Sequence, residues 1–262
     1  KQIKRDNISI EDYQELQKRF TKDKIPTYTE FILALPGDTY DSFAKGVSDV
    51  IDSGQHNKIQ YNNLSILPNA EMANPKNMDD NKIKTVECPI VNIHGSLDEA
   101  PLDGIHEKQQ LVISTKSLDF ENWKKTRVYA SVSELLYFNK LLQIPFLVLN
   151  KLEKISFKDL FEHFMDSPNK FKIIDKINSN FNNHALQISK GKSEFLYKDG
   201  MLDIYWPPGE FEYITLVLNN KLKDFYNEIQ DRYSSFCTND FSSKVFLKSL
   251  ELNQKMMRLP HK

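Results

Sequence analysis

The sequence predicts an α/β fold followed by a mainly helical domain. Residues 28–67 read as strand, tight turn, helix and strand, which is the pattern of a βαβ unit. A helical pattern at 10–21 precedes that unit and extends the alternation. Later in the chain one helix pattern follows another, so the two domains are expected at 1–115 and 116–262.

The first helix is predicted over 10–21. Ser9 is placed to cap its N-terminus. Tyr13, Leu16 and Phe20 then recur at helical spacing and form one apolar face. The helix is therefore expected to be amphipathic.

The βαβ unit begins with a strand at 28–35, whose near-continuous apolar end is typical of a strand covered on both faces. A turn at 36–37 follows, and Asp38 or Thr39 caps the next helix. The second strand, 59–67, is reached through short connections. We therefore expect parallel strands joined by a right-handed crossover.

The remaining elements are predicted from similar patterns. A polar loop at 75–84 precedes two short strands, at 86–93 and 111–115. The elements expected after them are helices at 119–143 (stopped by Pro145), 157–166 and 169–188, a short hairpin with its turn at Asp199-Gly200, one long helix opened by Pro207-Pro208, and a last helix from about Asp240 to Met257.

The bulk composition excludes several kinds of partner. With 35 basic and 36 acidic residues the formal charge is −1, which leaves no electrostatic footprint for nucleic acid. No apolar run approaches the roughly 18 residues that a membrane-spanning helix needs, so neither nucleic acid nor membrane is expected as a partner. The chain opens without Met, in what reads as the end of a helix, and is expected to be a fragment of something longer.

The two cysteines, Cys88 and Cys237, are far apart in the sequence. They could form one disulfide, but two buried thiols in a cytoplasmic protein are the favoured interpretation. No closely spaced set of cysteines is present to bind zinc or an iron–sulfur cluster. This chain alone is therefore not expected to hold such a cluster with its own thiolates.

Both strands of the predicted βαβ unit end in polar, turn-forming residues at one edge of a sheet, where α/β folds place their ligands. Residues 35–39 fit a ligand-proximal loop in which Gly37 allows close approach, and they also fit an ordinary capped turn. Residues 67–72 fit a surface for a purine or an amino-acid group, and they also fit a strand exit. The spacing alone favours the ordinary structural interpretation at both places.

Two other features have weaker functional interpretations. His56 fits a general base, but a histidine near a helix C-terminus is also favourable with the helix dipole. One polar loop gathers six potential metal ligands whose spacing matches no known signature: His94, Asp98, Glu99, Asp103, His106 and Glu107.

A resemblance to a known family adds what spacing cannot. Residues 30–39, Glu-Phe-Ile-Leu-Ala-Leu-Pro-Gly-Asp-Thr, resemble the fifth strand and helix of radical S-adenosylmethionine (radical SAM) enzymes, which usually read Glu-x-Ile-x-Gly-x-Pro-Gly-Glu-Thr. Residues 54–72 are similar to the sixth strand of the subgroup that carries an N-terminal cobalamin-binding domain. Parts of 110–145 resemble the region after the barrel in that subgroup, so the likeness covers roughly 1–145.

The resemblance implies that 1–72 is the last third of a partial (β/α) TIM-like barrel, with its cofactor at the carboxyl edge of the strands. Ala34 stands where the family usually has Gly, and Asp38 stands where it has Glu, so close approach and reach to the ligand are altered. The residues that would line the S-adenosylmethionine pocket, in part through backbone contacts to adenine, are Ala34, Pro36, Gly37, Asp38, Leu64, Leu67 and Pro68.

The resemblance also implies S-adenosylmethionine, a [4Fe-4S] cluster and cobalamin as cofactors of the parent enzyme. The three-cysteine cluster loop and any cobalamin motif are absent from these residues and are expected upstream. The upstream part of the same polypeptide is then the expected partner, and the small-molecule substrate is unknown.

Three functional hypotheses follow. The leading one is a fragment of a cobalamin-type radical SAM enzyme that acts on an unactivated carbon, plausibly by methyl transfer, with the isolated chain inactive. The main alternative is a non-enzymatic helical interaction module on a degenerate barrel remnant, which predicts an upstream sequence without a Cys-x-x-x-Cys-x-x-Cys loop. The third is metal-dependent hydrolysis through the loop at 94–107.

Overall fold

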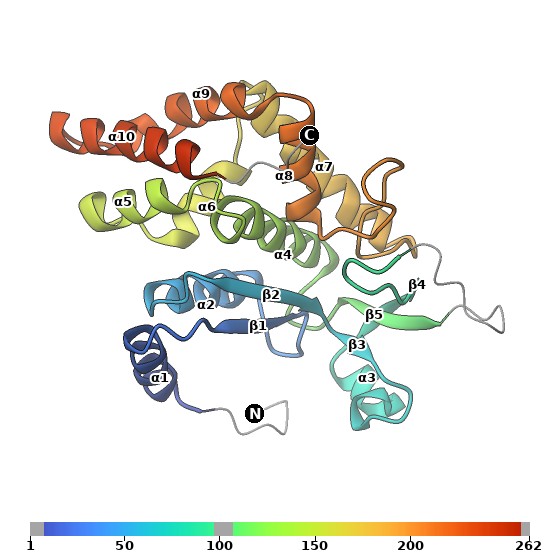
Figure 1. Cartoon of the computed structure of the whole chain (residues 1–262). Helices are drawn as coiled ribbons and strands as arrows, with labels where there is room; N and C mark the ends of the chain where they lie inside the picture. Colours follow the sequence, from blue (N-terminus) through green and yellow to red (C-terminus); the bar gives the residue numbers. More distant parts are fainter. Residues whose placement is uncertain (1–7, 97–106, 258–262) are drawn as a thin grey trace. The chain divides into compact units, whose positions relative to one another are not determined.

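The computed structural model describes residues 8–96 and 107–257 and is mixed α/β (Figure 1). The chain divides into two compact units. The first unit takes residues up to 128 together with 182–207, and the second takes 129–181 and the residues from 208 on. The expected domain boundary near 115 thus differs from this division, and 182–207 returns to the first unit. That boundary stays a prediction, because compactness alone does not show which parts fold independently.

The first unit contains all the strands found among the described residues. Its elements are α1 (Ile10–Lys22), β1 (Tyr28–Leu33), α2 (Tyr40–Asp52), β2 (Lys58–Asn63), β3 (Ser65–Ile66), the 3₁₀ turn η1 (Glu71–Ala73), α3 (Pro75–Asp80), β4 (Lys84–Pro89), β5 (Lys108–Ser114), the first part of α4 (Phe120–Ser133) and the end of α7 (Lys172–Ile188). The helix α3 lies where a plain polar loop was expected, because Asn74 caps it and Pro75 occupies its first position.

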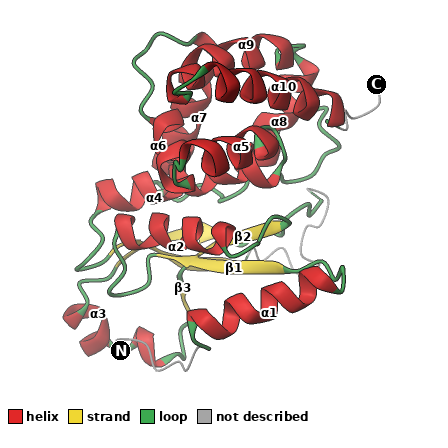
Figure 2. Cartoon of the chain, turned by 90° about the vertical axis from the view of Figure 1, so that its left-hand side faces the viewer, coloured by secondary structure: helices red, strands yellow, loops and turns green. Residues whose placement is uncertain are grey.

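The predicted βαβ unit is confirmed. β1 and β2 are parallel, with Leu33 opposite Asn63, and α2 connects them. α2 packs on one face of this sheet (Figure 2), where Phe43 contacts both Phe31 of β1 and Tyr61 of β2 at ring-centroid distances of 5.6 and 6.0 Å. The apolar face of α2 and the apolar ends of the strands explain this packing.

The predicted second strand is wrong in its length. It divides at Leu64 into β2 and β3, and β3 pairs antiparallel with β5 in a separate sheet of order β3-β5-β4. Leu64 donates its N–H to the carbonyl of Leu33 (2.9 Å) and accepts from the N–H of Val112 (2.9 Å). The chain therefore changes sheets at this residue, a step that local apolar pattern does not encode.

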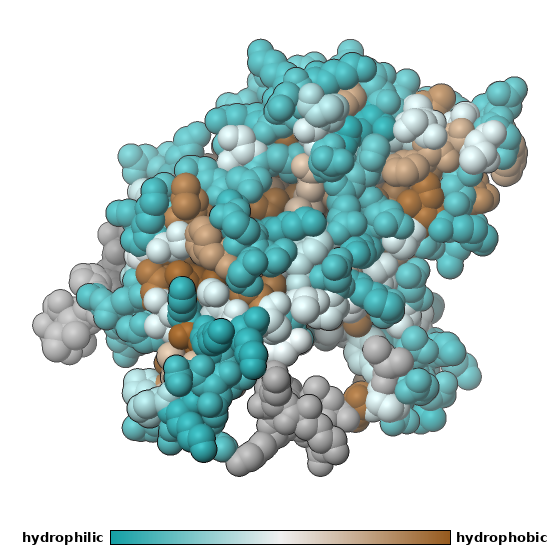
Figure 3. Space-filling view, turned by 180° about the vertical axis from the view of Figure 1, so that it is seen from behind, coloured by the Kyte–Doolittle hydropathy of each residue, from teal (hydrophilic) through white to brown (hydrophobic). Residues whose placement is uncertain are grey.

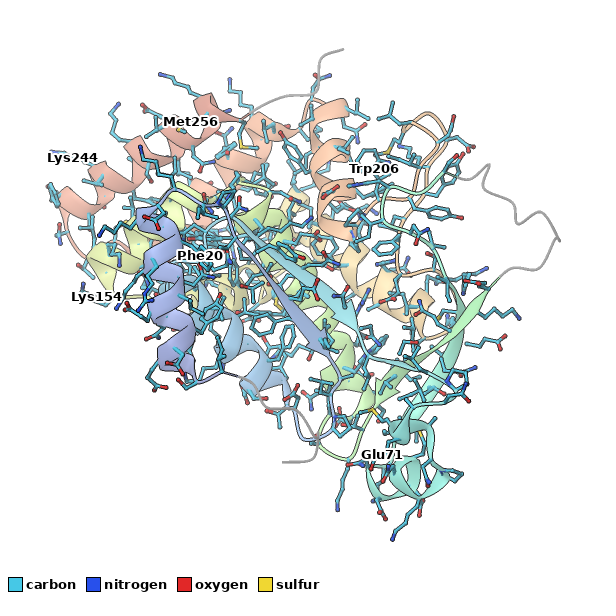
Figure 4. The ribbon with its side chains drawn as sticks, turned by 60° about the horizontal axis from the view of Figure 1, so that its bottom comes forward. Phe20, Glu71, Lys154, Trp206, Lys244 and Met256 are labelled. Atoms are coloured by element: carbon cyan, nitrogen blue, oxygen red, sulfur yellow. The ribbon has the colours of Figure 1, made fainter. Side chains whose placement is uncertain are left out.

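The amphipathic helix α1 is present, with Ser9 as its cap, but its apolar face is turned outward. Leu16 and Phe20 are 40% and 37% exposed, and Figure 4 labels Phe20 on this helix. Gln17 is buried instead, where its amide donates to the hydroxyl of Tyr13 at 3.0 Å. Polar contacts, rather than the apolar stripe, attach α1 to the described part of the unit.

The hairpin predicted around Asp199-Gly200 is reduced to a single pair. Leu196 and Trp206 exchange both backbone hydrogen bonds at 2.8 Å, and no longer ladder follows among the described residues. Ile204 instead forms a β-bridge with Ser96. The segment 204–206 therefore pairs with Leu196 at one residue and with Ser96 at another. The pair belongs to the first unit, not to the helical part.

The second unit is helical. Its elements are the end of α4, the π-helical segment η2 (Glu134–Phe138), α5 (Gln143–Glu153), α6 (Phe157–Met165), the first part of α7, α8 (Pro208–Leu218), α9 (Leu222–Tyr233), the 3₁₀ turn η3 (Ser234–Phe236) and α10 (Asp240–Met256). Its core is aromatic: Tyr137, Phe146, Phe157, Phe161 and Tyr233 are all at most 1% exposed.

Two helix boundaries in this unit differ from those predicted. Pro145 lies within the first turn of α5, where a proline needs no N–H partner, so it does not mark a stop between helices. The long helix expected from Pro207-Pro208 is split into α8 and α9, because Asn220 adopts a left-handed φ of +55° between them.

Within the residues described, no single helix combines the length and apolar composition needed to cross a bilayer. Among the same residues, the helical segments Phe120–Phe138 and Gln143–Glu153 meet the length and composition criteria only when they are counted together, and they are bent by 96° relative to each other. The space-filling view shows apolar patches among a mainly hydrophilic surface (Figure 3).

Candidate functional site: the carboxyl edge of β1 and β2

The carboxyl ends of β1 and β2 lie side by side. Leu33 and Asn63 are the last paired residues, and Ala34 and Leu64 follow them directly. The hydrogen bond from Leu64 N–H to Leu33 C=O joins the two strand exits. The structure therefore brings the first predicted wall segment, 34–38, next to Leu64, as the parallel βαβ pattern requires.

The turn after β1 is built on two left-handed residues. Ala34 has φ +68° and is 1% exposed, and Gly37 has φ +97° and is exposed. Asp38, which follows Gly37, donates its N–H to the carbonyl of Leu35 at 3.0 Å and closes the turn. A left-handed φ is costly for alanine and free for glycine. Ala34 thus keeps a backbone shape suited to the glycine found in the resembling family.

The helix after this turn is capped by Thr39 and not by Asp38. Thr39 and Ser42 form a reciprocal capping box, with Ser42 N–H to Thr39 Oγ1 at 3.1 Å. Asp38 is left half-buried beside the N-terminus of α2, and burial raises the pKa of its carboxyl group. The edge therefore presents one carboxyl group that is not used as a helix cap.

The second predicted wall segment is divided by the change of sheets. Leu64 remains at the edge, with its backbone N–H and C=O both hydrogen-bonded. Leu67 and Pro68 come after β3 and are exposed, Leu67 to 65%. Figure 4 labels Glu71 a few residues further on, in the turn η1. These last two positions therefore form an outer rim and not part of a packed wall.

Two further contacts at this edge were not predicted. Ser117 Oγ accepts the N–H of Gly37 at 3.0 Å, and the indole N–H of Trp123 donates to Asn63 Oδ1 at 3.0 Å. The partners are 80 and 60 residues apart, so no local pattern could have joined them. The one available signal was the polar side chain of Asn63 on the inward-facing side of a strand.

The face of the β1–β2 sheet opposite α2 carries polar side chains. Glu30 and Gln60 are register partners on this face, and Gln60 Nε2 donates to Asn62 Oδ1 at 3.3 Å. Glu30 is exposed and the two amides are half-buried. These groups adjoin the carboxyl edge, and they were not predicted because they lie within the strands and not at the strand ends.

The described residues do not support the two other candidate sites, the metal site in the loop at 94–107 and the general base His56. No group of three or more His, Cys, Asp or Glu side chains there is placed to hold a metal ion. His94 packs its ring edge-on to Trp206 at 5.2 Å, while the predicted ligands at 98–106 lie outside the described residues. His56 is exposed.

The two cysteines are free, so the disulfide alternative is wrong. Cys88 is buried, as expected, and burial with the nearby Glu194 carboxylate raises the pKa of its thiol to about 11. Cys237 is only half-buried, and burial raises the pKa of its thiol too. Both thiols are therefore kept protonated and are poor nucleophiles at neutral pH.

Comparison with known proteins matches the family resemblance. The chain is 29% identical over 136 residues, 52% of its length, to the cobalamin-dependent radical SAM methyltransferase TokK of Streptomyces tokunonensis. The chain is related to the cobalamin-dependent radical SAM enzymes. It is also 32% identical over 122 residues to a 2-(S-pantetheinyl)-carbapenam-3-carboxylate methyltransferase of Streptantibioticus cattleyicolor. The matched regions span 19% and 17% of these two relatives, under a fifth of their length. No family model matches the chain.

Proposed function

We propose that this chain is the carboxyl-terminal part of a cobalamin-dependent radical SAM enzyme that transfers a methyl group to an unactivated carbon. The observation that carries the proposal is the meeting of the segment 34–38 with Leu64 at one sheet edge, in a chain related to such enzymes. By itself the chain is inert in this proposal, because it holds only part of the machinery.

In the proposal, the edge forms one wall of the S-adenosylmethionine pocket. Gly37 has no side chain, is exposed and adopts φ +97°, so a ligand can approach its backbone closely. Asp38 offers a half-buried carboxyl group to the ligand's cationic or hydroxyl groups. Leu67 and Pro68 supply exposed apolar surface at the rim.

The three expected cofactors fit this chain unequally. S-adenosylmethionine fits the exposed edge described above. The cluster does not fit, since the chain has only two cysteines, far apart in the sequence and one of them buried in the first unit, whereas the expected cluster loop has three closely spaced cysteines. When bound in the complete protein, the cluster supplies electrons and cobalamin carries the methyl group. Their ligands belong to other residues in this proposal.

The upstream polypeptide expected in this proposal has a surface of this chain on which it can pack. Among the described residues β1 pairs with β2 alone, so its outer edge has backbone groups open to another strand. Two parallel strands form a marginal sheet by themselves. Leu16, Phe20 and Ile25, from α1 and the loop after it, are exposed near this end of the unit. We propose that the upstream polypeptide adds a parallel strand here and extends the sheet into a partial (β/α) barrel.

The proposal also gives the open face of the sheet a role. Glu30, Gln60 and Asn62 would then line the interior of the partial barrel, where polar side chains can orient the substrate. A carboxylate and two amides suit a substrate with several hydrogen-bond donors and acceptors.

The encoding gene and its complete product test this proposal. We expect a Cys-x-x-x-Cys-x-x-Cys loop in the codons that precede this chain. We also expect about four iron atoms per polypeptide after anaerobic reconstitution of the complete protein, because the cluster has that composition. A gene without the loop, or a complete product that takes up no iron, would support the non-enzymatic helical module instead.

A further inference from the structure

We propose that residues 115–123, which comprise the connection from β5 to α4 and the first turn of α4, form a clamp that positions both pocket-wall segments, with Ser117 and Trp123 as its positioning residues. This inference rests on the proposed function and assigns these two residues to it. The clamp contacts the turn after β1 at one point and the end of β2 at another. Both contacts lie within the first unit.

The first contact is made by a rigid turn. Thr115 N–H donates to Leu118 C=O at 2.7 Å, and Leu118 N–H donates to Thr115 Oγ1 at 3.1 Å. Lys116 N–H is anchored to the carbonyl of Asn81 at 2.7 Å. These bonds fix Ser117, whose Oγ accepts the N–H of Gly37. The Gly37 peptide, an exposed part of the proposed wall, is thus oriented from outside its own turn.

The second contact is made by a buried amide. Asn63 Nδ2 donates to the carbonyls of Val112 (2.9 Å) and Leu64 (3.1 Å), and its Oδ1 accepts from Trp123 Nε1 (3.0 Å). Every polar atom of this side chain has a partner, and a flipped amide would place its oxygen against two carbonyls. Trp123 is fully buried and Asn63 is 8% exposed, so water does not compete for these bonds.

The two contacts together define the spacing of the edge. Ser117 fixes the peptide at Gly37, and Trp123 fixes Asn63, the residue that immediately precedes Leu64. Because both residues belong to the segment 115–123, this segment links the two wall segments to each other. A ligand that touches both segments therefore depends on this connection without touching Trp123.

The chain offers matched controls for both contacts. Ser117→Ala removes the acceptor of the Gly37 N–H, and Ser117→Thr keeps a hydroxyl group. Trp123→Phe keeps an aromatic ring and removes the indole donor. Trp206→Phe is its control, because the Trp206 indole also donates one 3.0 Å hydrogen bond, to the Met201 carbonyl, away from the edge.

Amide hydrogen exchange measured by NMR on this chain tests the clamp without a ligand. We expect Ser117→Ala to raise the exchange rate at Gly37 several-fold and to leave Leu64 unchanged. We expect Trp123→Phe to raise the exchange rates at Leu64 and Val112 and to leave Gly37 unchanged. Unaltered exchange in both variants would overturn the clamp, whatever the function of the protein.

The dissociation constant for S-adenosylmethionine in the complete reconstituted protein tests the positioning role. Loss of one neutral hydrogen bond corresponds to about a fivefold change, so we expect roughly that increase for Ser117→Ala and Trp123→Phe. Ser117→Thr should restore the wild-type value and Trp206→Phe should not alter it. Unchanged affinity in both clamp variants would overturn the positioning role alone. Failure of the wild-type protein to bind S-adenosylmethionine would overturn the proposed function, and the positioning role with it.

Discussion

The indole N–H of Trp123 and the side-chain oxygen of Asn63 form a buried hydrogen bond of 3.0 Å across 60 residues of sequence. It connects the start of α4 to the last residue of β2, where the chain leaves the parallel sheet. The same asparagine donates to Leu64 and Val112. One amide therefore completes the backbone hydrogen bonding at the point where the two sheets of the first unit meet.

Trp123→Phe is predicted to lower the free energy of unfolding by about 2 kcal/mol, because it leaves a buried amide oxygen without a donor. Urea denaturation monitored by circular dichroism measures this. Trp206→Phe should cost less, since the hydrogen bond of Trp206 is only partly buried. Equal losses in the two variants would contradict the importance assigned to the Asn63 network.

Ala34→Gly is predicted to leave the free energy of unfolding within about 1 kcal/mol of wild type. Relief of the left-handed strain, worth about 1–2 kcal/mol, offsets the lost buried methyl group and the added freedom of the unfolded chain. Ala44→Gly is the matched control, because Ala44 is equally buried but lies inside α2. We expect that change to cost about 2 kcal/mol, from helix propensity and the lost methyl group. Similar losses at both positions would contradict the strained geometry of Ala34.

Acid is predicted to destabilise the first unit through His184. This side chain is 7% exposed, its Nε2 has no hydrogen-bond partner, and burial with the nearby Arg127 charge lowers its pKa to about 3. The folded pKa lies below the unfolded value of about 6.5, so the unfolded state binds the proton first. The contribution of neutral His184 to the free energy of unfolding is therefore fully present above about pH 6.5. It is lost progressively as the pH falls from there towards 3.

The size of this effect follows from proton linkage. Between pH 7.5 and pH 5 the free energy of unfolding should fall by about 2 kcal/mol from His184 alone. Denaturant midpoints measured across this range should show a flatter profile in His184→Leu than in wild type. His56→Gln, at an exposed histidine, is the control and should keep the wild-type slope. Parallel profiles for wild type and His184→Leu would refute the linkage.

Arg127→Ala is predicted to destabilise the protein by about 3 kcal/mol. Arg127 pairs with Glu194 at 2.8 Å, and the two side chains are only 10% and 15% exposed, so removing one leaves a buried charge unpaired. The double variant Arg127→Met/Glu194→Leu should recover much of that loss. Lys221→Ala tests an exposed pair with Asp224 and should change stability by no more than about 0.5 kcal/mol. Thermal or urea unfolding of the three variants and the wild type decides the comparison.

The local parts of the fold could be predicted from the sequence. Ser9 and Thr39 act as caps, and α6 and α10 begin and end close to the expected positions, because caps and apolar spacing act within a few residues. The parallel pairing of β1 and β2 followed from the βαβ pattern.

The rest depends on contacts between distant residues. The division of the second strand at Leu64 depends on the hydrogen bond with Val112. The exposure of Leu16 and Phe20 depends on which other residues pack against α1, and local sequence does not specify those residues. The candidate site likewise has a part that was predictable from the sequence and a part that was not. Its edge was predictable from strand ends, whereas Ser117 came from a segment 80 residues away and carries no motif.

The most direct test of the central claim is the release of 5′-deoxyadenosine by the complete, anaerobically reconstituted protein. We expect that product when reductant and S-adenosylmethionine are supplied. We also expect that Asp38→Glu, which installs the family's usual residue, keeps the activity, whereas Asp38→Ala raises the KM for S-adenosylmethionine about tenfold, as expected for one lost charge-assisted contact. A protein that holds its cluster and leaves S-adenosylmethionine uncleaved would refute the proposed function.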